Sequence, residues 1–149
     1  MTYTYTYPRA SVTVDMAVFS KTGKGWSVLL IQRGNPPFQD GWALPGGFIE
    51  MDETLVESAH RELVEETGLS GIELEQFMTY GDPGRDPRGR TVSVVFFGFA
   101  DSSNTMVAGG DDAKSAAWYC LDNLPQLAFD HKEILQQLIQ KLNDDKLLP

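Results

Sequence analysis

The sequence has 149 residues, of which 42% are hydrophobic, and it carries a formal net charge of −9. This length fits one domain, and the apolar fraction is too high for a disordered chain. The negative charge argues against nonspecific binding to nucleic acid or anionic membranes. No apolar run reaches the roughly 18 residues that span a bilayer, and Met1–Arg9 lacks the layout of a signal peptide. We therefore expect one α/β domain over residues 1–149, with Cys120 as its one cysteine and a reducing cytoplasm as its location.

Hydrophobic periodicity predicts the elements of the first half of the chain. Val12–Val18 alternates with period two, and Trp26–Gln32 is an apolar run of strand length, so both are predicted as strands. A loop rich in glycine and proline then leads to Gly47. A helix is predicted from about Glu53 to Thr67, where Gly68 is well placed to end it.

The second half predicts strands that loops separate, followed by a helix. The connector of residues 81–89 is too rich in glycine and proline to be regular structure. The last helix is expected to begin near Asp130, because Asp130 and Glu133 have the spacing of a capping box. Strands are expected at Ile72–Tyr80, Thr91–Ala100 and Ala116–Cys120.

The helix predicted after Gly47 carries a cluster of acids at its end. Glu62 and Glu66 are four residues apart, so an ideal helix places them on one face, with Glu65 on the other side of Glu62. Such carboxylates repel each other unless a cation lies between them, and Mg²⁺ or Mn²⁺ prefers hard oxygen ligands. A solvated helix face is the alternative interpretation. The two histidines, His60 and His131, are isolated and are interpreted as surface or structural residues.

The fixed positions of this acidic segment match one family motif. They are Gly47, five residues, Glu53, seven residues, Arg61–Glu62–Leu63, one residue, Glu65–Glu66, one residue, and Gly68–Leu69. At average residue frequencies a chance match is on the order of 10⁻⁹ per starting position. The chain therefore resembles the Nudix hydrolases. This resemblance implies the Nudix fold, a mixed β-sheet sandwiched between α-helices, and metal-dependent hydrolysis of a nucleoside diphosphate linked to another group.

The resemblance also implies a set of metal ligands. Glu62 and Glu66 look like the main ligands of Mg²⁺ or Mn²⁺. Glu65 looks like a further ligand or a catalytic support, and the backbone carbonyl of Gly46 like an additional ligand. The cation neutralises the pyrophosphate and activates a water, and a carboxylate takes the proton or orients that water.

Three further residues are expected to act in catalysis. Arg61 looks like a residue that orients a carboxylate, with Glu53 as its partner, although an ideal helix separates them by about 80°. Pairing therefore needs Glu53 in a bent first turn. Nudix relatives often place an outlying acid, a ligand or base, where Asp111 and Asp112 stand. The family more often uses glutamate there, and Asp112 is the stronger candidate, with solvation in a loop as the alternative.

Segments outside the acidic motif resemble the ADP-ribose pyrophosphatase-like Nudix domains. Pro83 lies 15 residues after Gly68, about where a proline marks ADP-ribose-cleaving members. The implied reaction is ADP-ribose and water to AMP and ribose 5-phosphate. Two alternatives stay open: another nucleotide substrate, such as a damaged nucleoside triphosphate or NADH, or a non-catalytic sensor that binds ADP-ribose. The resembling segments are Tyr7–Arg9, Val12–Asp15, Arg33–Phe38, Trp42–Phe48, Gly81–Arg90 and Ala128–His131.

Substrate contacts are expected from arginines and one aromatic ring. The guanidinium group can hold phosphate oxygens through two parallel hydrogen bonds, with a solvated basic turn as the alternative. An aromatic ring can stack on adenine, with ordinary packing as the alternative. The candidates are Arg33, Arg85, Arg88, Arg90 and Phe48.

The expected partners are a small nucleotide and a second copy of the chain. Residues Tyr3–Tyr7 alternate like an exposed edge strand. Related enzymes are often dimers that exchange N-terminal strands, so the resemblance implies a homodimer. Neither nucleic acid nor membrane is expected as a partner.

Overall fold

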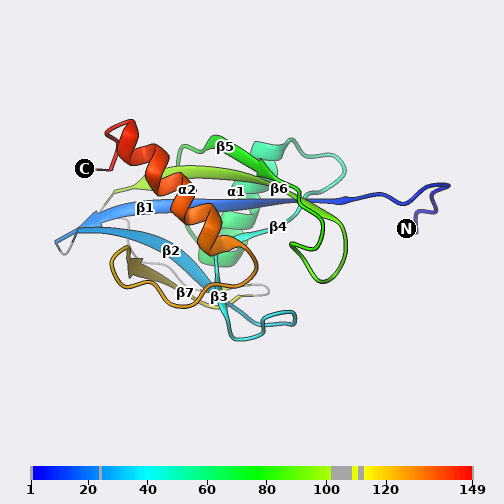
Figure 1. The fold of residues 1–149 in the computed structure, drawn as a ribbon, viewed down its shortest axis with the longest axis horizontal. Helices are drawn as coiled ribbons and strands as arrows, with labels where there is room; N and C mark the ends of the chain where they lie inside the picture. The colour runs from blue at the N-terminus through cyan, green and yellow to red at the C-terminus, as the bar shows by residue number, and fades with distance from the viewer. Residues whose placement is uncertain (1, 24, 102–108, 111–112, 149) are drawn as a thin grey trace.

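Residues 2–23, 25–101, 109–110 and 113–148, as the computed structural model describes them, form a mixed seven-stranded sheet with a helix on each face (Figure 1). The strand order is β3-β2-β1-β6-β5, with β4 also paired to β1 and β7 to β2. β1 and β6 are parallel, and the other strand pairs are antiparallel. The predicted fold, a mixed sheet between helices, is confirmed. The elements are β1 (Ser11–Thr22), β2 (Gly25–Arg33), β3 (Trp42–Ala43), β4 (Gly46–Phe48), α1 (Leu55–Thr67), β5 (Glu75–Tyr80), β6 (Thr91–Ala100), β7 (Ala113–Cys120) and α2 (His131–Asp144).

β1 is a central strand that separates two apolar cores. Because side chains alternate along a strand, Met16 and Val18 pack in the core that includes Leu63 of α1. Phe19 points to the other face and packs in the core that includes Leu135 of α2. The period-two pattern is confirmed, and both of its faces are buried because a helix covers each one (Figure 1).

β1 changes its antiparallel partner part-way along. Residues Thr13–Asp15 pair with β4, whereas Phe19–Thr22 pair with β2. Parallel pairing with β6 continues along the opposite edge of β1 from Ser11 to Ser20. The sheet is therefore split beside Asp15, and this split positions the site described below.

α1 begins at Leu55 and not at Glu53, because Thr54 caps it. The Thr54 hydroxyl accepts a hydrogen bond from the Glu57 N–H, and the Glu57 carboxylate accepts one from the Thr54 N–H. This capping box leaves Glu53 outside the helix. The predicted end is confirmed: Gly68 has a φ of 75° and donates its N–H to the Val64 carbonyl.

Several strand boundaries differ from the prediction. The segment before Gly47, expected to be a loop, contains the short strands β3 and β4. These few residues pair with β1 and β2, and this pairing outweighs the preference of the local glycines and prolines for a loop. β5 begins at Glu75 and not at Ile72, and β7 begins at Ala113 and not at Ala116.

The capping box expected at the start of α2 is wrong. α2 does begin after Asp130, but the Asp130 side chain makes no capping hydrogen bond. Its carboxylate instead accepts two hydrogen bonds from Arg85, in the connector between β5 and β6. The Asp130 carboxylate therefore forms an ion pair with Arg85 in place of the helix cap that local spacing predicted.

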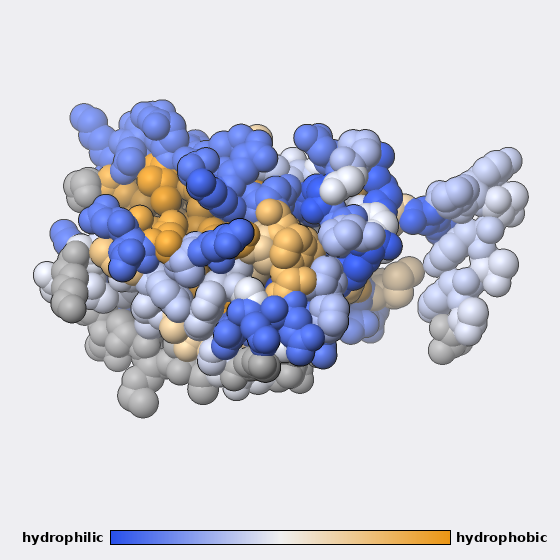
Figure 2. Space-filling view, turned by 60° about the horizontal axis from the view of Figure 1, so that its bottom comes forward, coloured by the Kyte–Doolittle hydropathy of each residue, from blue (hydrophilic) through white to orange (hydrophobic). Residues whose placement is uncertain are grey.

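An N-terminal arm projects from the body, at the right of Figures 1 and 2. Tyr3, Tyr5 and Tyr7 are exposed. The Tyr3 and Tyr5 rings stack with centroids 6.3 Å apart, and the Arg9 guanidinium lies 3.9 Å from the Tyr5 centroid. Described residues 2–10 form no strand in the single chain, so strand exchange between two chains stays a prediction. Among the described helices, none has the length and apolar character to cross a membrane.

Candidate active site

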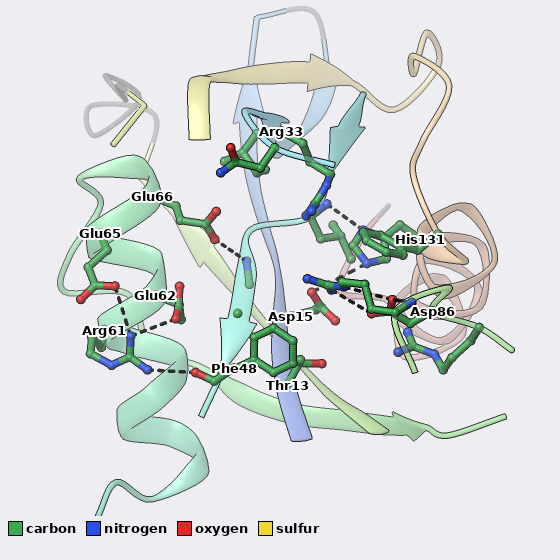
Figure 3. Close-up of a pocket in the computed structure, with 18 of the residues that line it drawn as sticks. Thr13, Asp15, Arg33, Phe48, Arg61, Glu62, Glu65, Glu66, Asp86 and His131 are labelled. Atoms are coloured by element: carbon green, nitrogen blue, oxygen red, sulfur yellow. Dashed lines mark hydrogen bonds and ion pairs between the residues drawn. The ribbon is translucent and has the colours of Figure 1, made fainter. Parts of the chain in front are cut away.

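A cavity of about 410 Å³ lies at the split in the sheet (Figure 3). It is lined by β1, by β4, by the second half of α1, by the connector between β5 and β6, and by the start of α2. Most of the residues predicted for the site line this one cavity. They are Gly46, Phe48, Arg61, Glu62, Glu65, Glu66, Arg33, Arg85 and Arg88.

Two glycines of the β4 segment make room for carboxylates. A side chain at Gly46 would collide with the Asp15 carboxylate and the Val14 carbonyl, and one at Gly47 would collide with the Glu62 carboxylate. The backbone of β4 therefore lies directly against one acid from β1 and one from α1. Glycine is required at Gly46, where the collision includes backbone atoms, whereas at Gly47 the collision is only with the movable end of the Glu62 side chain.

Glu66 is the most enclosed acid of the α1 cluster. Its residue surface is 6% exposed, and its Oε1 accepts a hydrogen bond from the Gly46 N–H at 2.7 Å. Burial raises the pKa of Glu66 to about 8, although the Gly46 hydrogen bond opposes the shift. The negative charges of Glu62 and Asp15 raise it further. Positive charge in the cavity would favour the ionised form of this carboxylate.

Arg61 holds the other acids of the segment. Its Nε donates to Glu53 at 2.7 and 3.0 Å, and its Nη1 donates to Glu62 at 2.9 Å and Glu65 at 3.1 Å. Its Nη2 donates to the Phe48 carbonyl at 3.2 Å. Burial lowers the pKa of Arg61, but the hydrogen bonds that Arg61 donates to Glu53 and Glu62, together with the negative charges of these acids, outweigh burial and raise it. The expected pairing of Arg61 with Glu53 is present because Glu53 precedes the helix cap.

The three glutamates at the end of α1 do not converge equally. Figure 3 shows Glu65 turned toward Arg61, and its side chain is 39% exposed. Glu62 and Glu66 lie on the cavity side of the helix, as their spacing predicted. Within the described part of the chain, no group of three or more acids, histidines or cysteines is arranged to hold a metal ion. Asp111 and Asp112 lie outside the described residues.

The carboxylates of Glu62 and Glu66 fit a hard divalent cation whose other ligands come from water and substrate. Mg²⁺ is usually bound by one or two carboxylates, several waters and substrate phosphates. Glu62 and Glu66 supply two carboxylates at one wall of a cavity large enough for a nucleotide. The same set does not suit structural zinc, which takes four nitrogen or sulfur ligands.

The wall opposite α1 is basic and aromatic. Arg85 forms a bidentate pair with Asp130 at 2.9 and 2.7 Å, and the Arg85 side chain is only 7% exposed. Arg88 pairs with Asp86 at 3.1 and 2.8 Å. Burial would raise the pKa of Asp86, but the hydrogen bonds from Arg88 outweigh burial and lower it. Both arginines line the cavity already paired with acids of their own chain.

Arg88 also lies between two aromatic rings. Its guanidinium carbon is 5.1 Å from the Phe48 ring centroid and 5.7 Å from that of Phe129. Phe129 has a φ of 53°, in the left-handed region that a non-glycine residue rarely adopts. It packs edge-on against Phe38, at 4.8 Å, and beneath Arg33, at 5.0 Å. The sequence signal for Phe129 was its place in the resembling segment Ala128–His131, which gave it no role.

Two predicted residues lie outside the cavity lining. Arg90 is exposed and donates to the Gly81 carbonyl at 2.9 Å, which closes the connector on itself. Glu53 reaches the site only through Arg61. Substrate contact by Arg90 therefore finds no support in its position.

A buried polar network at the split was missed by sequence reasoning. Asp15 accepts a hydrogen bond from the Ser93 hydroxyl of β6. His131, at the start of α2, accepts the Leu44 N–H on Nδ1 at 3.0 Å, and its Nε2 lies 3.7 Å from Asp15 Oδ1. Asp15 and His131 both line the cavity. The signal that could have found Asp15 is a charged residue in the middle of an apolar strand.

Of the two interpretations of His131, surface or structural, the surface one is wrong, because its side chain is buried and holds the Leu44 N–H; it also lines the cavity. Burial lowers the pKa of His131. The charges of Asp15 and Asp130 oppose this shift, and those of Arg85 and Arg33 support it. Burial therefore favours the neutral form of the His131 imidazole.

The mixed sheet between two helices, with the paired glutamates of α1 facing a cavity, defines a Nudix domain. The chain belongs to the Nudix family, because the NUDIX domain model matches residues 9–138. It is 42% identical over 137 residues to a Methanocaldococcus jannaschii protein named ADP-ribose pyrophosphatase, covering 92% of this chain and 78% of that protein. It is 40% identical over 142 residues to the ADPR responsive transcriptional repressor NtrR of Acinetobacter baylyi. That match covers 93% of this chain but only 56% of the repressor.

Solved structures agree with this assignment. The NUDIX domain of Shewanella oneidensis NrtR, complexed with ADP ribose, has a TM-score of 0.84 and 32% identity. The match covers 91% of this chain and 90% of that one. A MutT/nudix family protein from Enterococcus faecalis has a TM-score of 0.86 and 32% identity, covering 96% of this chain and 66% of that one.

Proposed function

We propose that this chain hydrolyses ADP-ribose to AMP and ribose 5-phosphate with Mg²⁺ or Mn²⁺ as cofactor. The observation that carries the proposal is one cavity with two kinds of wall: Glu62 and Glu66 on one side, arginines and aromatic rings on the other. A diphosphate joined to a sugar and a base needs both a cation site and a stacking surface. The archaeal relative named ADP-ribose pyrophosphatase supports this choice of substrate.

Glu62 and Glu66 would hold the cation, with the Gly46 carbonyl as a further ligand. When bound, the cation neutralises the diphosphate and activates water for attack on phosphorus. Arg61 keeps Glu62 in place through its 2.9 Å hydrogen bond and carries the charge that balances the cluster. Glu65, held 3.1 Å from Arg61, is one candidate base, and Asp112 is the other.

The opposite wall would hold the rest of the nucleotide. The Phe48 residue is 45% exposed and offers its ring to a base, which suits stacking. Arg88, held near Phe48 and Phe129, presents a planar cation beside that surface. Arg33 and Arg85 also line the cavity, where their guanidinium groups would offer hydrogen-bond donors to phosphate oxygens, with Arg85 already oriented by Asp130.

The test is product analysis on ADP-ribose with Mg²⁺, with and without EDTA, beside a damaged nucleoside triphosphate and NADH. We expect AMP and ribose 5-phosphate in equal amounts, lost in EDTA and in Glu66→Gln. The matched control is Glu57→Gln, which removes one acid from the exposed first turn of the same helix. Hydrolysis of NADH or the triphosphate with intact ADP-ribose would keep the chemistry and reject the substrate.

A second candidate function is a sensor that binds ADP-ribose without turning it over. The Acinetobacter repressor and the ADP-ribose complex of the Shewanella domain favour it. The carboxylates Glu62 and Glu66 facing the cavity favour hydrolysis instead. Tight binding of ADP-ribose in Mg²⁺ with no product after prolonged incubation would select the sensor.

We also propose that residues 1–149 form one domain, and that the protein acts in the cytoplasm as a homodimer. The projecting N-terminal arm, with its exposed Tyr3, Tyr5 and Tyr7, supplies a surface that a second copy could cover. Light scattering of the full chain beside a variant lacking residues 2–8 tests this. A monomeric mass for the full chain would reject the dimer.

A further inference from the structure

We infer that Asp15 and His131 form a subsite for a hydroxyl group of the sugar in the substrate. This inference rests on the proposed function and adds a recognition element to it. Figure 3 places Asp15 between the glutamates of α1 and the wall that holds Asp86 and His131. A ligand whose diphosphate lies at the glutamates would bring a neighbouring ribose to this position.

The first step is the state of His131. Its Nδ1 accepts the Leu44 N–H, so the proton of the neutral ring is on Nε2. The His131 side chain is 5% exposed and lines the cavity. The nearest carboxylate oxygen, Asp15 Oδ1, is 3.7 Å away, which is too long for a hydrogen bond. Among the described residues, none accepts a hydrogen bond from this Nε2–H.

The second step is the state of Asp15. Ser93 donates its hydroxyl to Asp15 Oδ2, which fixes the orientation of the carboxylate. Gly46 has no side chain, so Oδ1 can lie against the β4 backbone beside the cavity. The cavity therefore presents one buried donor and one buried acceptor, 3.7 Å apart.

The third step is the complementary ligand. A hydroxyl accepts one hydrogen bond and donates another through the same oxygen. It can therefore accept from His131 Nε2–H and donate to Asp15 Oδ1 at once. A phosphate cannot donate, and the Asp15 charge repels it. A substrate without this hydroxyl leaves a buried donor and acceptor unpaired, which is a strong basis for rejection.

The experiment measures binding in EDTA by calorimetry, so that turnover does not contribute. Asp15→Asn keeps an acceptor oxygen but removes its charge, so it should raise the Kd of ADP-ribose about 10-fold. If Asp15 only repelled the charged ligand, its removal would lower the Kd. The direction of the change in Kd therefore separates a lost hydrogen bond from lost charge repulsion. Asp122→Asn, exposed after β7, is the matched control for charge. Ser93→Ala, which removes the group that orients Asp15, should weaken binding less and provides a second variant if Asp15→Asn unfolds.

Two shorter ligands identify the group that is recognised. If the Asp15→Asn effect is lost with ADP, the terminal ribose supplies the hydroxyl. If it persists with ADP and is lost with 2′,3′-dideoxy-ADP, the adenosine ribose supplies it. An effect that persists with both would assign the pair to the adenine edge and overturn the inference.

The remaining outcomes separate this inference from the proposed function. No binding of ADP-ribose by the unmodified chain would overturn the substrate and this subsite together. Binding that Asp15→Asn leaves unchanged or tightens would overturn the subsite alone, with water as the occupant of the gap between His131 and Asp15.

Discussion

Removing one partner of the ion pair between Arg85 and Asp130 should destabilise the fold strongly, because the other charge would stay buried. The pair's two hydrogen bonds are 2.9 and 2.7 Å long, and the side chains are 7% and 20% exposed. Removal of one partner from a buried pair costs roughly 3–5 kcal/mol, because the other charge stays buried without compensation. Since Asp130 is partly exposed, we expect Asp130→Ala to lower the free energy of unfolding by about 3 kcal/mol. No capping bond is lost, because the Asp130 side chain makes none.

Urea unfolding of Asp130→Ala, Arg85→Met and the double variant measures this destabilisation. The double variant should be more stable than the sum of the single changes predicts, because neither charge is then left buried alone. Asp145→Ala breaks the exposed pair with Lys141, 3.0 Å long, and should cost less than about 1 kcal/mol. A cost for Asp130→Ala no larger than this control, or strict additivity in the double variant, would refute the reasoning.

Three further substitutions test the site. Arg61→Met should lower Mg²⁺-dependent hydrolysis about 10- to 100-fold, because Glu62 and Glu65 lose their shared cation; initial rates against Mg²⁺ concentration measure it, and an unchanged rate would contradict it. Gly47→Ala should change how the initial rate depends on Mg²⁺ concentration, because its Cβ displaces the Glu62 carboxylate. It should change the urea midpoint little, since the end of the Glu62 side chain is flexible. His131→Gln should flatten the loss of stability below pH 6.5. The folded pKa of His131 lies below the 6.5 of the unfolded chain, so on acidification only the unfolded chain takes up this proton. Stability then falls by up to about 1.4 kcal/mol per pH unit. Urea unfolding between pH 7 and 5, with His60→Gln as control, measures the slope, and equal slopes would contradict the assignment.

The part of the site that sequence predicted is the part built from local geometry. Glu62 and Glu66 share a helix, so their spacing alone placed both on one face, and the structure turns that face to the cavity. The missed part depends on pairing across the fold. Ser93 and Asp15 are 78 residues apart, and they meet because β1 and β6 are parallel neighbours. Leu44 and His131 are 87 residues apart and meet because α2 docks beside the split.

The starts of α1 and α2 show the same difference between local and long-range effects. α1 begins after Thr54 and not at Glu53 because threonine is a favoured N-cap residue, and this is a signal within the local sequence. The start of α2 was misinterpreted for a different reason. Asp130 has the local chemistry of a cap, but Arg85 lies 45 residues away in sequence and takes its carboxylate. Local spacing carries no information about that competitor.

The three arginines of the connector looked equivalent in the sequence, and the structure gives each a different task. Arg90 closes the connector onto the Gly81 carbonyl, and Arg85 fastens it to Asp130 at the start of α2. Arg88 lines the cavity beside Phe48. Because Arg85 also fixes the helix end that carries His131, the connector and the polar subsite are mechanically linked. In a chain with a net charge of −9, Arg85 and Arg88 thereby face the acidic wall while each stays paired with an aspartate.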